Sequence, residues 1–168
     1  MNARGLAEVV GVLGVMGSLI FVGLEVRQNS VATRASNNAT VADAYRQTNT
    51  MIASSPDLAR AMVAVGEDPD LASAADRILV LGLWRAVFHT WSNVHRQWVS
   101  DTLDQVLYES FVEEVSSYSS KTGMDDSIDQ VDRRTRTMLW AWESEKFVFN
   151  SEFRNFVDTI VETGYPPN

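Results

Sequence analysis

The chain has 168 residues, enough for one domain with its own hydrophobic core. It contains no cysteine, which excludes disulfides and cysteine-ligated metals, and its net charge of −8 argues against nucleic acid as a partner. The charge is uneven, because residues 1–46 carry a net +1 and the remaining residues a net −9. Near an anionic lipid surface the acidic part should therefore stand off, with the N-terminal arginines closer to the lipid.

The first element is an apolar stretch over residues 5–25, which we predict to be a transmembrane helix. The 16 residues from Val9 to Leu24 carry no charge, and counting from Gly5 gives 20 residues, long enough to cross a hydrocarbon core of about 30 Å. A cleaved signal peptide and a buried helix of a soluble protein are the alternatives. No clean small-x-small cleavage site follows Leu24, and five glycines are costly in a soluble helix, so a retained span is favoured.

The span carries small residues along one stripe, namely Ala7, Gly11, Gly14 and Ser18. Their spacing of 4, 3 and 4 places them on one helix face, where small side chains let helix backbones approach closely in lipid. We therefore predict that the span self-associates into a homo-oligomer. The alternative is that glycine is simply common in membrane helices.

Residues 26–53 contain no Pro or Gly and are predicted to form a juxtamembrane helix that continues the span. The spacing of the small stripe also continues, through Phe21, Glu25, Gln28, Ala32, Ala35, Ala39 and Ala42. This seam extends the oligomer contact or, alternatively, its alanines pack against the protein's own domain.

A helical bundle domain is predicted over residues 54–164, followed by a tail at 165–168. Its expected helices are 56–65, 74–99, 102–119, 130–146 and 151–163. The expected N-caps are the serine that precedes Pro56, together with Ser73, Asp101 and Asn150. The expected helix ends are Gly66 and Gly164. No alternating β pattern occurs, so the fold class is all-α: an N-terminal transmembrane helix that continues into or is followed by an antiparallel bundle of about five helices.

The helix at 74–99 carries a stripe of rings at spacings of 4, 3, 4 and 3. The rings are Trp84, Phe88, Trp91, His95 and Trp98. We interpret the stripe as an aromatic core that Trp140, Trp142, Phe147 and Phe149 meet from a later helix, with Trp91 and Trp98 both buried. His95 is interpreted as a hydrogen-bonded core residue and not a metal ligand. A ligand or haem pocket along the stripe is the alternative.

The opposite face of the same helix carries a polar strip of Arg85, His89, Asn93 and Arg96. The strip could bind a carboxylate or phosphate, or it could pair with an internal acid or face water.

No catalytic, cofactor or metal site is predicted. Neither histidine has a carboxylate three residues before it, and no phosphate loop or nucleophile elbow occurs. Four acids, Asp125, Asp126, Asp129 and Asp132, lie close together, but their spacing does not match a calcium loop. We interpret them as a solvated loop and helix start.

Four short segments resemble a family of uncharacterised small bacterial membrane proteins that have a glycine-containing hydrophobic N-terminus. Residues 23–29, GLEVRQN, are similar to a family motif like YQIRQN, and the other segments are 54–60, 85–88 and 151–158. The chain departs from the family at Asn150-Ser151, where the family has Ser-Pro, and at His95. The resemblance implies a bacterial single-pass membrane protein and brings no activity.

We predict a membrane-anchored, self-associating helical domain with a scaffolding or regulatory role, in the bacterial inner membrane. Because Arg27 and Arg34 follow the span, the C-terminal domain is expected in the cytoplasm. The expected partners are membrane lipid, further copies of the chain and an unidentified protein, without nucleic acid. One alternative is a subunit of a small pore with Glu25 ringing one mouth. Another is a ligand sensor or enzyme that uses the aromatic stripe and the strip with Arg85, His89 and Arg96.

Overall fold

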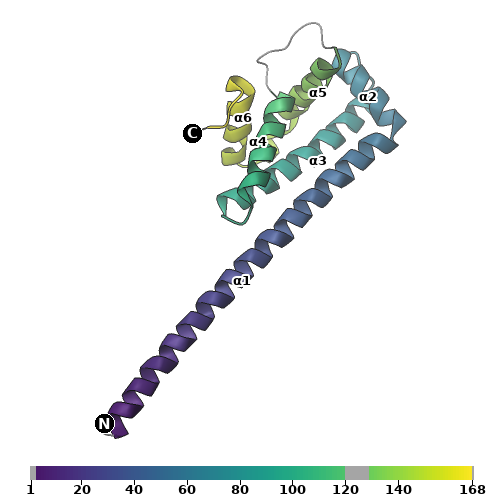
Figure 1. Ribbon diagram of the computed structural model, residues 1–168. Coiled ribbons are helices and arrows are strands. Elements are labelled where there is room, and N and C mark those ends of the chain that lie inside the picture. Colours follow the sequence, from purple (N-terminus) through teal and green to yellow (C-terminus); the bar gives the residue numbers. More distant parts are fainter. Residues whose placement is uncertain (1–2, 120–128, 168) are drawn as a thin grey trace.

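The computed structural model describes the backbone of residues 3–119 and 129–167 and the side chains of residues 11–119 and 133–167. Within these residues the chain forms six α-helices and one short 3-10 helix, without a strand. Figure 1 shows a long first helix, α1, that runs along one side of a bundle formed by α2 to α6. The all-α prediction, with a long N-terminal apolar helix before a bundle, is confirmed.

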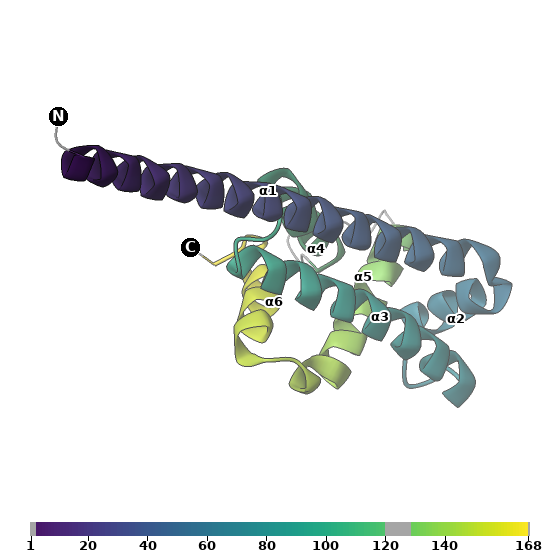
Figure 2. The ribbon, with the colours of Figure 1, turned by 90° about the horizontal axis from the view of Figure 1, so that it is seen from below.

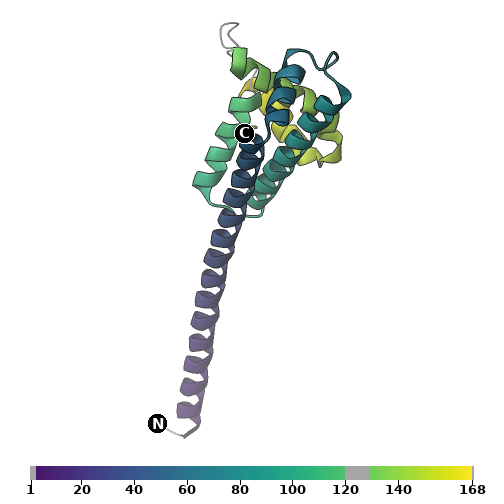
Figure 3. The same ribbon diagram turned by 90° about the vertical axis from the view of Figure 1, so that its right-hand side faces the viewer.

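Helix α1 (Ala3–Ser54) is continuous over 52 residues, about 78 Å at the usual rise per residue. All described side chains from residue 11 to 36 are exposed, and the part of α1 before Arg34 projects alone from the bundle (Figures 1 and 3). Among the described residues α1 alone is long and apolar enough to cross a membrane, and none of its apolar window is buried. The juxtamembrane helix is therefore a direct extension of the candidate span.

Helices α2 (Pro56–Glu67) and α3 (Ala74–Val99) begin at their expected serine caps. The Ser55 side chain accepts the backbone N–H of Leu58, and Ser73 accepts that of Asp76. The prediction that Gly66 ends its helix is wrong, because α2 continues through Glu67. A Cβ atom at Gly66 would lie 2.8 Å from Cβ of Arg133, so this glycine allows α2 and α5 to approach closely.

Helix α4 (Gln105–Ser119) starts three residues later than expected, and Asp101 is not its cap. Asp101 instead adopts a left-handed conformation, with φ of 52°, in the turn that follows α3. Its backbone N–H donates to the carbonyl of Trp98 at 2.9 Å, which satisfies the end of α3. The Asp104 carboxylate takes the capping role, because it accepts the N–H of Val106 at 2.9 Å.

Helix α5 (Asp129–Glu145) ends in a single 3-10 turn, η1 (Lys146–Val148), and α6 (Ser151–Thr163) follows. The expected caps of α6 are both present. Asn150 accepts the backbone N–H of Phe153 at 2.8 Å, and Gly164 closes the helix in the left-handed region, with φ of 79°.

The core forms around α3, which contacts α1, α2, α4 and α5, while α6 packs on α4 (Figure 2). The rings of Trp84, Phe88 and Trp91 are buried, and Trp142 closes on Phe88 with ring centroids 5.1 Å apart. The prediction that Trp98 is buried is wrong, because 36 % of it is exposed. Trp98 lies in the last turn of α3 and stacks on Tyr108 of α4, with centroids 4.2 Å apart, while its other side faces solvent.

Candidate functional site

A pocket of about 300 Å³ lies where α1, α3 and α4 meet, and its size falls at the lower end of the range for small-molecule sites. Its lining combines apolar and aromatic side chains with a few polar groups. The lining residues are Tyr45, Thr48, Asn49, Ile52, Met62, Leu83, Trp84, Val87, Thr90, Glu114, Tyr118 and Arg134.

Helix α1 supplies one wall of the pocket, with Tyr45, Thr48, Asn49 and Ile52 at the spacing of a single helix face. Val41, one turn earlier on this face, is buried in the core. The same helix that forms the candidate span therefore contributes side chains to the pocket.

Aromatic rings form the opposite wall. The indole N–H of Trp84 donates to the hydroxyl of Thr137 at 3.1 Å, which fixes the Trp84 ring against α5. The ring of Tyr118 meets Trp84 edge-on at 5.7 Å and lies 6.1 Å from Trp91. Mutual contact among the three rings limits their freedom to rotate, so this wall is preformed.

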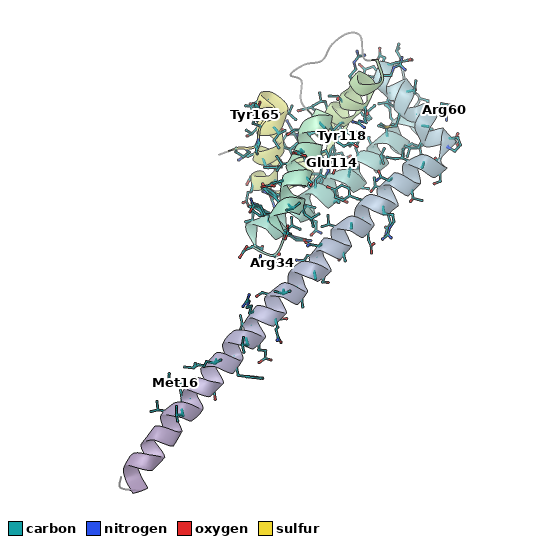
Figure 4. All side chains as sticks on the ribbon, in the orientation of Figure 1. Met16, Arg34, Arg60, Glu114, Tyr118 and Tyr165 are labelled. Carbon is teal, nitrogen blue, oxygen red and sulfur yellow. The ribbon has the colours of Figure 1, made fainter. Side chains whose placement is uncertain are left out.

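Glu114 provides the acidic group of the pocket, one helical turn before Tyr118 on α4 (Figure 4). No described residue forms an ion pair with it within 4 Å. Burial raises the pKa of its carboxyl, against the opposing influence of the Tyr45 hydroxyl, the Trp91 indole and the positive charge of Arg134. A carboxylate with a raised pKa in a pocket is a typical feature of a functional site.

Two donors lie near this carboxylate without a well-formed hydrogen bond. The hydroxyl of Tyr45 and the indole N–H of Trp91 are close enough to act on the pKa of Glu114, yet both atoms are buried without a partner at standard hydrogen-bond geometry. Burial, followed by the negative charge of Glu114, raises the pKa of Tyr45 far above its usual value. The phenol therefore stays protonated and remains a donor.

Arg134 of α5 places its charge at the same pocket. Its guanidinium carbon lies 4.0 Å from the centroid of the Tyr118 ring, a cation–π contact, and its side chain is otherwise exposed. A second, more open groove between α1 and α4 shares Tyr45, Asn49 and Glu114 with the pocket.

The polar strip on α3 lines neither of these two cavities. Arg85 forms a two-pronged ion pair with the buried Glu145, at 3.0 and 2.6 Å. Arg96 donates to the side-chain oxygen of Asn93 at 2.8 Å, and the ring of His89 lies 5.1 Å from Phe149. The strip is thus occupied by contacts within the chain.

The small-residue stripe lies on the projecting half of α1. The side chain of Ala7 is outside the described residues, whereas Gly11, Gly14 and Ser18 are exposed, and a Cβ atom at either glycine would have nothing within 4 Å. The Ser18 hydroxyl donates to the carbonyl of Gly14 at 2.9 Å. Glu25, the candidate pore-mouth acid, is exposed farther along the helix.

The alternative that the alanines of the extended seam are buried against the bundle is wrong. The alanines are all exposed and are therefore not buried against the bundle, although Ala42 lines the open groove between α1 and α4; they are Ala32, Ala35, Ala39 and Ala42. The bundle packs instead on the face of α1 that carries Asn37, Val41 and Tyr45.

His95 is buried next to Phe156, with ring centroids 4.6 Å apart, but neither ring nitrogen has a hydrogen-bond partner among the described residues. The hydrogen bond expected for the His95 side chain is thus absent among the described residues. Burial lowers the pKa of His95, partly opposed by Glu152. No cluster of metal-ligating side chains occurs in the described part of the chain, and the side chains of the acid cluster at 125–132 lie outside it.

Sequence reasoning missed Tyr45, Glu114, Tyr118 and Arg134. A signal for Glu114 was present, because this acid stands three residues after Phe111 and four before Tyr118, on the apolar face of its helix. An unpaired acid among aromatic residues on a buried face is a candidate site residue.

The chain matches no protein-family model, no curated protein and no solved structure.

Proposed function

We propose that the protein is a membrane-anchored helical domain with a regulatory role, which binds a small molecule in the pocket between α1, α3 and α4. One observation carries this proposal: α1 is both the candidate membrane span and a wall of the pocket. A ligand that changes how α1 packs on α3 would therefore act on the span without an intervening hinge.

Two polar contacts connect α1 to the turn between α3 and α4, on the N-terminal side of the pocket along α1. Arg34 donates to the carboxylate of Asp101 at 2.9 Å, and the side-chain amide of Asn37 donates to the carbonyl of Thr102 at 3.0 Å. Both contacts are exposed or half-buried, so they can be exchanged at little cost. A ligand bound in the pocket could thus shift α1 relative to the bundle.

The proposed location is the bacterial inner membrane, with the bundle in the cytoplasm. The apolar window of α1 and the resemblance to small bacterial membrane proteins support the location, and the arginines Arg27 and Arg34 after the window support the orientation. Reporter fusions at the C-terminus test it, and activity confined to a periplasmic reporter would reverse the orientation.

We further propose that α1 contacts a second copy of the chain through its small-residue seam. The monomer leaves this seam uncovered, and Gly11 and Gly14 meet nothing within the chain. Self-association is better supported than a pore, because Ser18 is the sole polar side chain between Gly11 and Leu24, and its hydroxyl is already bonded to the backbone. An unidentified protein could then read out the assembly.

A matched pair of threonines on α1 tests the pocket. Thr48 lines it and Thr40 lies on the exposed surface, and each donates to the carbonyl four residues earlier at 3.0 Å. Thr48→Phe should fill the pocket, whereas Thr40→Phe should leave it open. In a thermal-shift screen of a small-molecule library, we expect compounds that stabilise the wild type and Thr40→Phe but not Thr48→Phe. If every stabilising compound acts equally on all three proteins, the pocket is not a binding site.

A further inference from the structure

The pocket already holds a cation against an aromatic face. The guanidinium of Arg134 lies over the Tyr118 ring, 4.0 Å from its centroid, and Trp84 meets the same ring from the side. Aromatic faces attract cations through the negative potential above the ring, and rings that converge from several directions are the usual receptors of ammonium groups.

The pocket also supplies a carboxyl group, that of Glu114, which forms no ion pair with a described residue. Glu114 and Arg134 are the two charged residues among those that line the pocket, and they do not form an ion pair within 4 Å. The fully buried indole N–H of Trp91 and the hydroxyl of Tyr45 lie near the carboxylate without a partner of good geometry. Burial raises the pKa of the Glu114 carboxyl, and these two donors, together with the positive charge of Arg134, partly oppose that shift and so favour the ionised form.

Of the residues at the Tyr118 ring, Arg134 can leave its position most easily. Its long side chain is exposed, so it can turn into solvent without losing hydration. Tyr118, by contrast, packs against the hydrophobic core, and Glu114 is half-buried one helical turn before it on α4 (Figure 4). A competing cation could take the place over the Tyr118 ring once the guanidinium moves away.

We propose that the pocket binds a small organic cation, with its ammonium group over the Tyr118 ring and beside the Glu114 carboxylate, in the position that the Arg134 guanidinium occupies. This inference rests on the proposed function, because it names the ligand class of the same pocket. The net charge of −8 adds a long-range attraction for such a ligand.

Three probes of nearly the same shape separate the ligand classes. Choline carries a trimethylammonium group, 3,3-dimethylbutan-1-ol replaces it by a neutral tert-butyl group, and 3,3-dimethylbutanoate carries a negative charge. Each is titrated by calorimetry into the full chain in a maltoside detergent, which contains no ammonium group. We expect choline to bind at least tenfold more tightly than the alcohol, and the alcohol to bind more tightly than the acid.

Three variants locate the binding. Glu114→Gln keeps the size of the side chain and should weaken choline at least tenfold while leaving the alcohol unchanged. Arg134→Met should strengthen choline about threefold or more, because the internal competitor is gone. Arg136→Met removes the same charge from an exposed position of α5 that does not line the pocket, and it should have no effect.

Failure of this inference differs from failure of the proposed function. The inference is overturned if choline binds no more tightly than the alcohol, if the acid binds best, if choline does not bind, or if its binding ignores Glu114→Gln and Arg134→Met. The library screen with Thr48→Phe and Thr40→Phe decides independently whether the pocket binds any ligand. Because Arg134 is an exposed side chain, its variant remains informative even if Glu114→Gln lowers expression.

Discussion

Trp91 and Trp98 are seven residues apart on one stripe of α3, yet they differ in burial. Trp91 is fully buried, so Trp91→Ala should destabilise the domain by about 3–5 kcal/mol, the usual cost of deleting a buried ring. Trp98→Ala should cost about 1–2 kcal/mol, because it loses chiefly its stacking on Tyr108. Chemical unfolding of the detergent-extracted protein measures both, and equal losses would contradict the difference in burial.

His95 should make stability depend on pH. Burial lowers the pKa of His95 in the folded chain, so below the unfolded value of about 6.5 the unfolded chain binds more protons. The free energy of unfolding should therefore decrease as the pH falls from about 6.5. His95→Leu should flatten this dependence, whereas His89→Gln, at the exposed histidine, should keep it. Parallel pH curves for the wild type and His95→Leu would contradict the assignment.

For single residues, the sequence predicted which helix face is buried but not where along the helix the burial ends. The spacing of the rings identified the face of α3 that is buried, because a stripe of this period has to pack. The spacing could not show that Trp98 lies at the end of α3, where fewer helices pack against it. The exposure of Trp98 depends on where α4 begins and on the conformation of the turn at Asp101. The role of Glu114 depends on Tyr45, which is 69 residues away in the chain.

Two glycines inside helices should respond to alanine in opposite ways. Gly66→Ala should destabilise the bundle by about 1–3 kcal/mol, because its Cβ would lie 2.8 Å from Arg133 and α2 would have to move from α5. Gly82→Ala, in α3, meets nothing within 4 Å and should stabilise it by about 0.5–1 kcal/mol through helix propensity. Thermal unfolding of both variants measures the two signs. The packing of α2 on α5 is contradicted if Gly66→Ala also stabilises.

The glycine stripe of α1 should govern assembly in the membrane. Gly14→Leu should push neighbouring helices apart and reduce cross-linked oligomer several-fold in intact membranes. Val12→Leu changes an exposed position off the stripe and serves as the control. Equal oligomer yields for the three proteins would mean that these glycines are not the contact, which would then lie at Ala32, Ala35, Ala39 and Ala42 or nowhere.

The helix boundaries were predictable where local chemistry sets them. Ser55, Ser73 and Asn150 each accept a backbone N–H three residues later, so their type and position suffice to identify a helix start. Gly66 was misread because its role comes from a neighbouring helix and not from its own. Asp101 was not the cap because two aspartates, Asp101 and Asp104, precede α4, and the second of them accepts the backbone N–H at its start.

For the whole molecule, an apolar first segment and helical periodicity after it were enough to predict an all-α chain with a bundle behind a candidate span. The pocket was not predictable in this way, since its walls come from five helices whose relative placement no local pattern encodes. The sequence permits a continuous helix α1 through the weak helix formers Asn29 and Ser30 but does not by itself establish it. It is also the feature on which the proposed coupling of pocket and membrane depends.

A nitroxide scan along α1 tests this continuity most directly. The chain has no cysteine, so single cysteines placed at successive positions from 11 to 53 can each carry one spin label in liposomes. We predict high collision with oxygen up to about Leu24, and a helical period that stays in phase to protected positions at Val41, Tyr45 and Thr48. A break in phase between Glu25 and Val41, or labels before Leu24 that collide with a water-soluble relaxer and not with oxygen, would contradict a single helix that joins the membrane to the pocket.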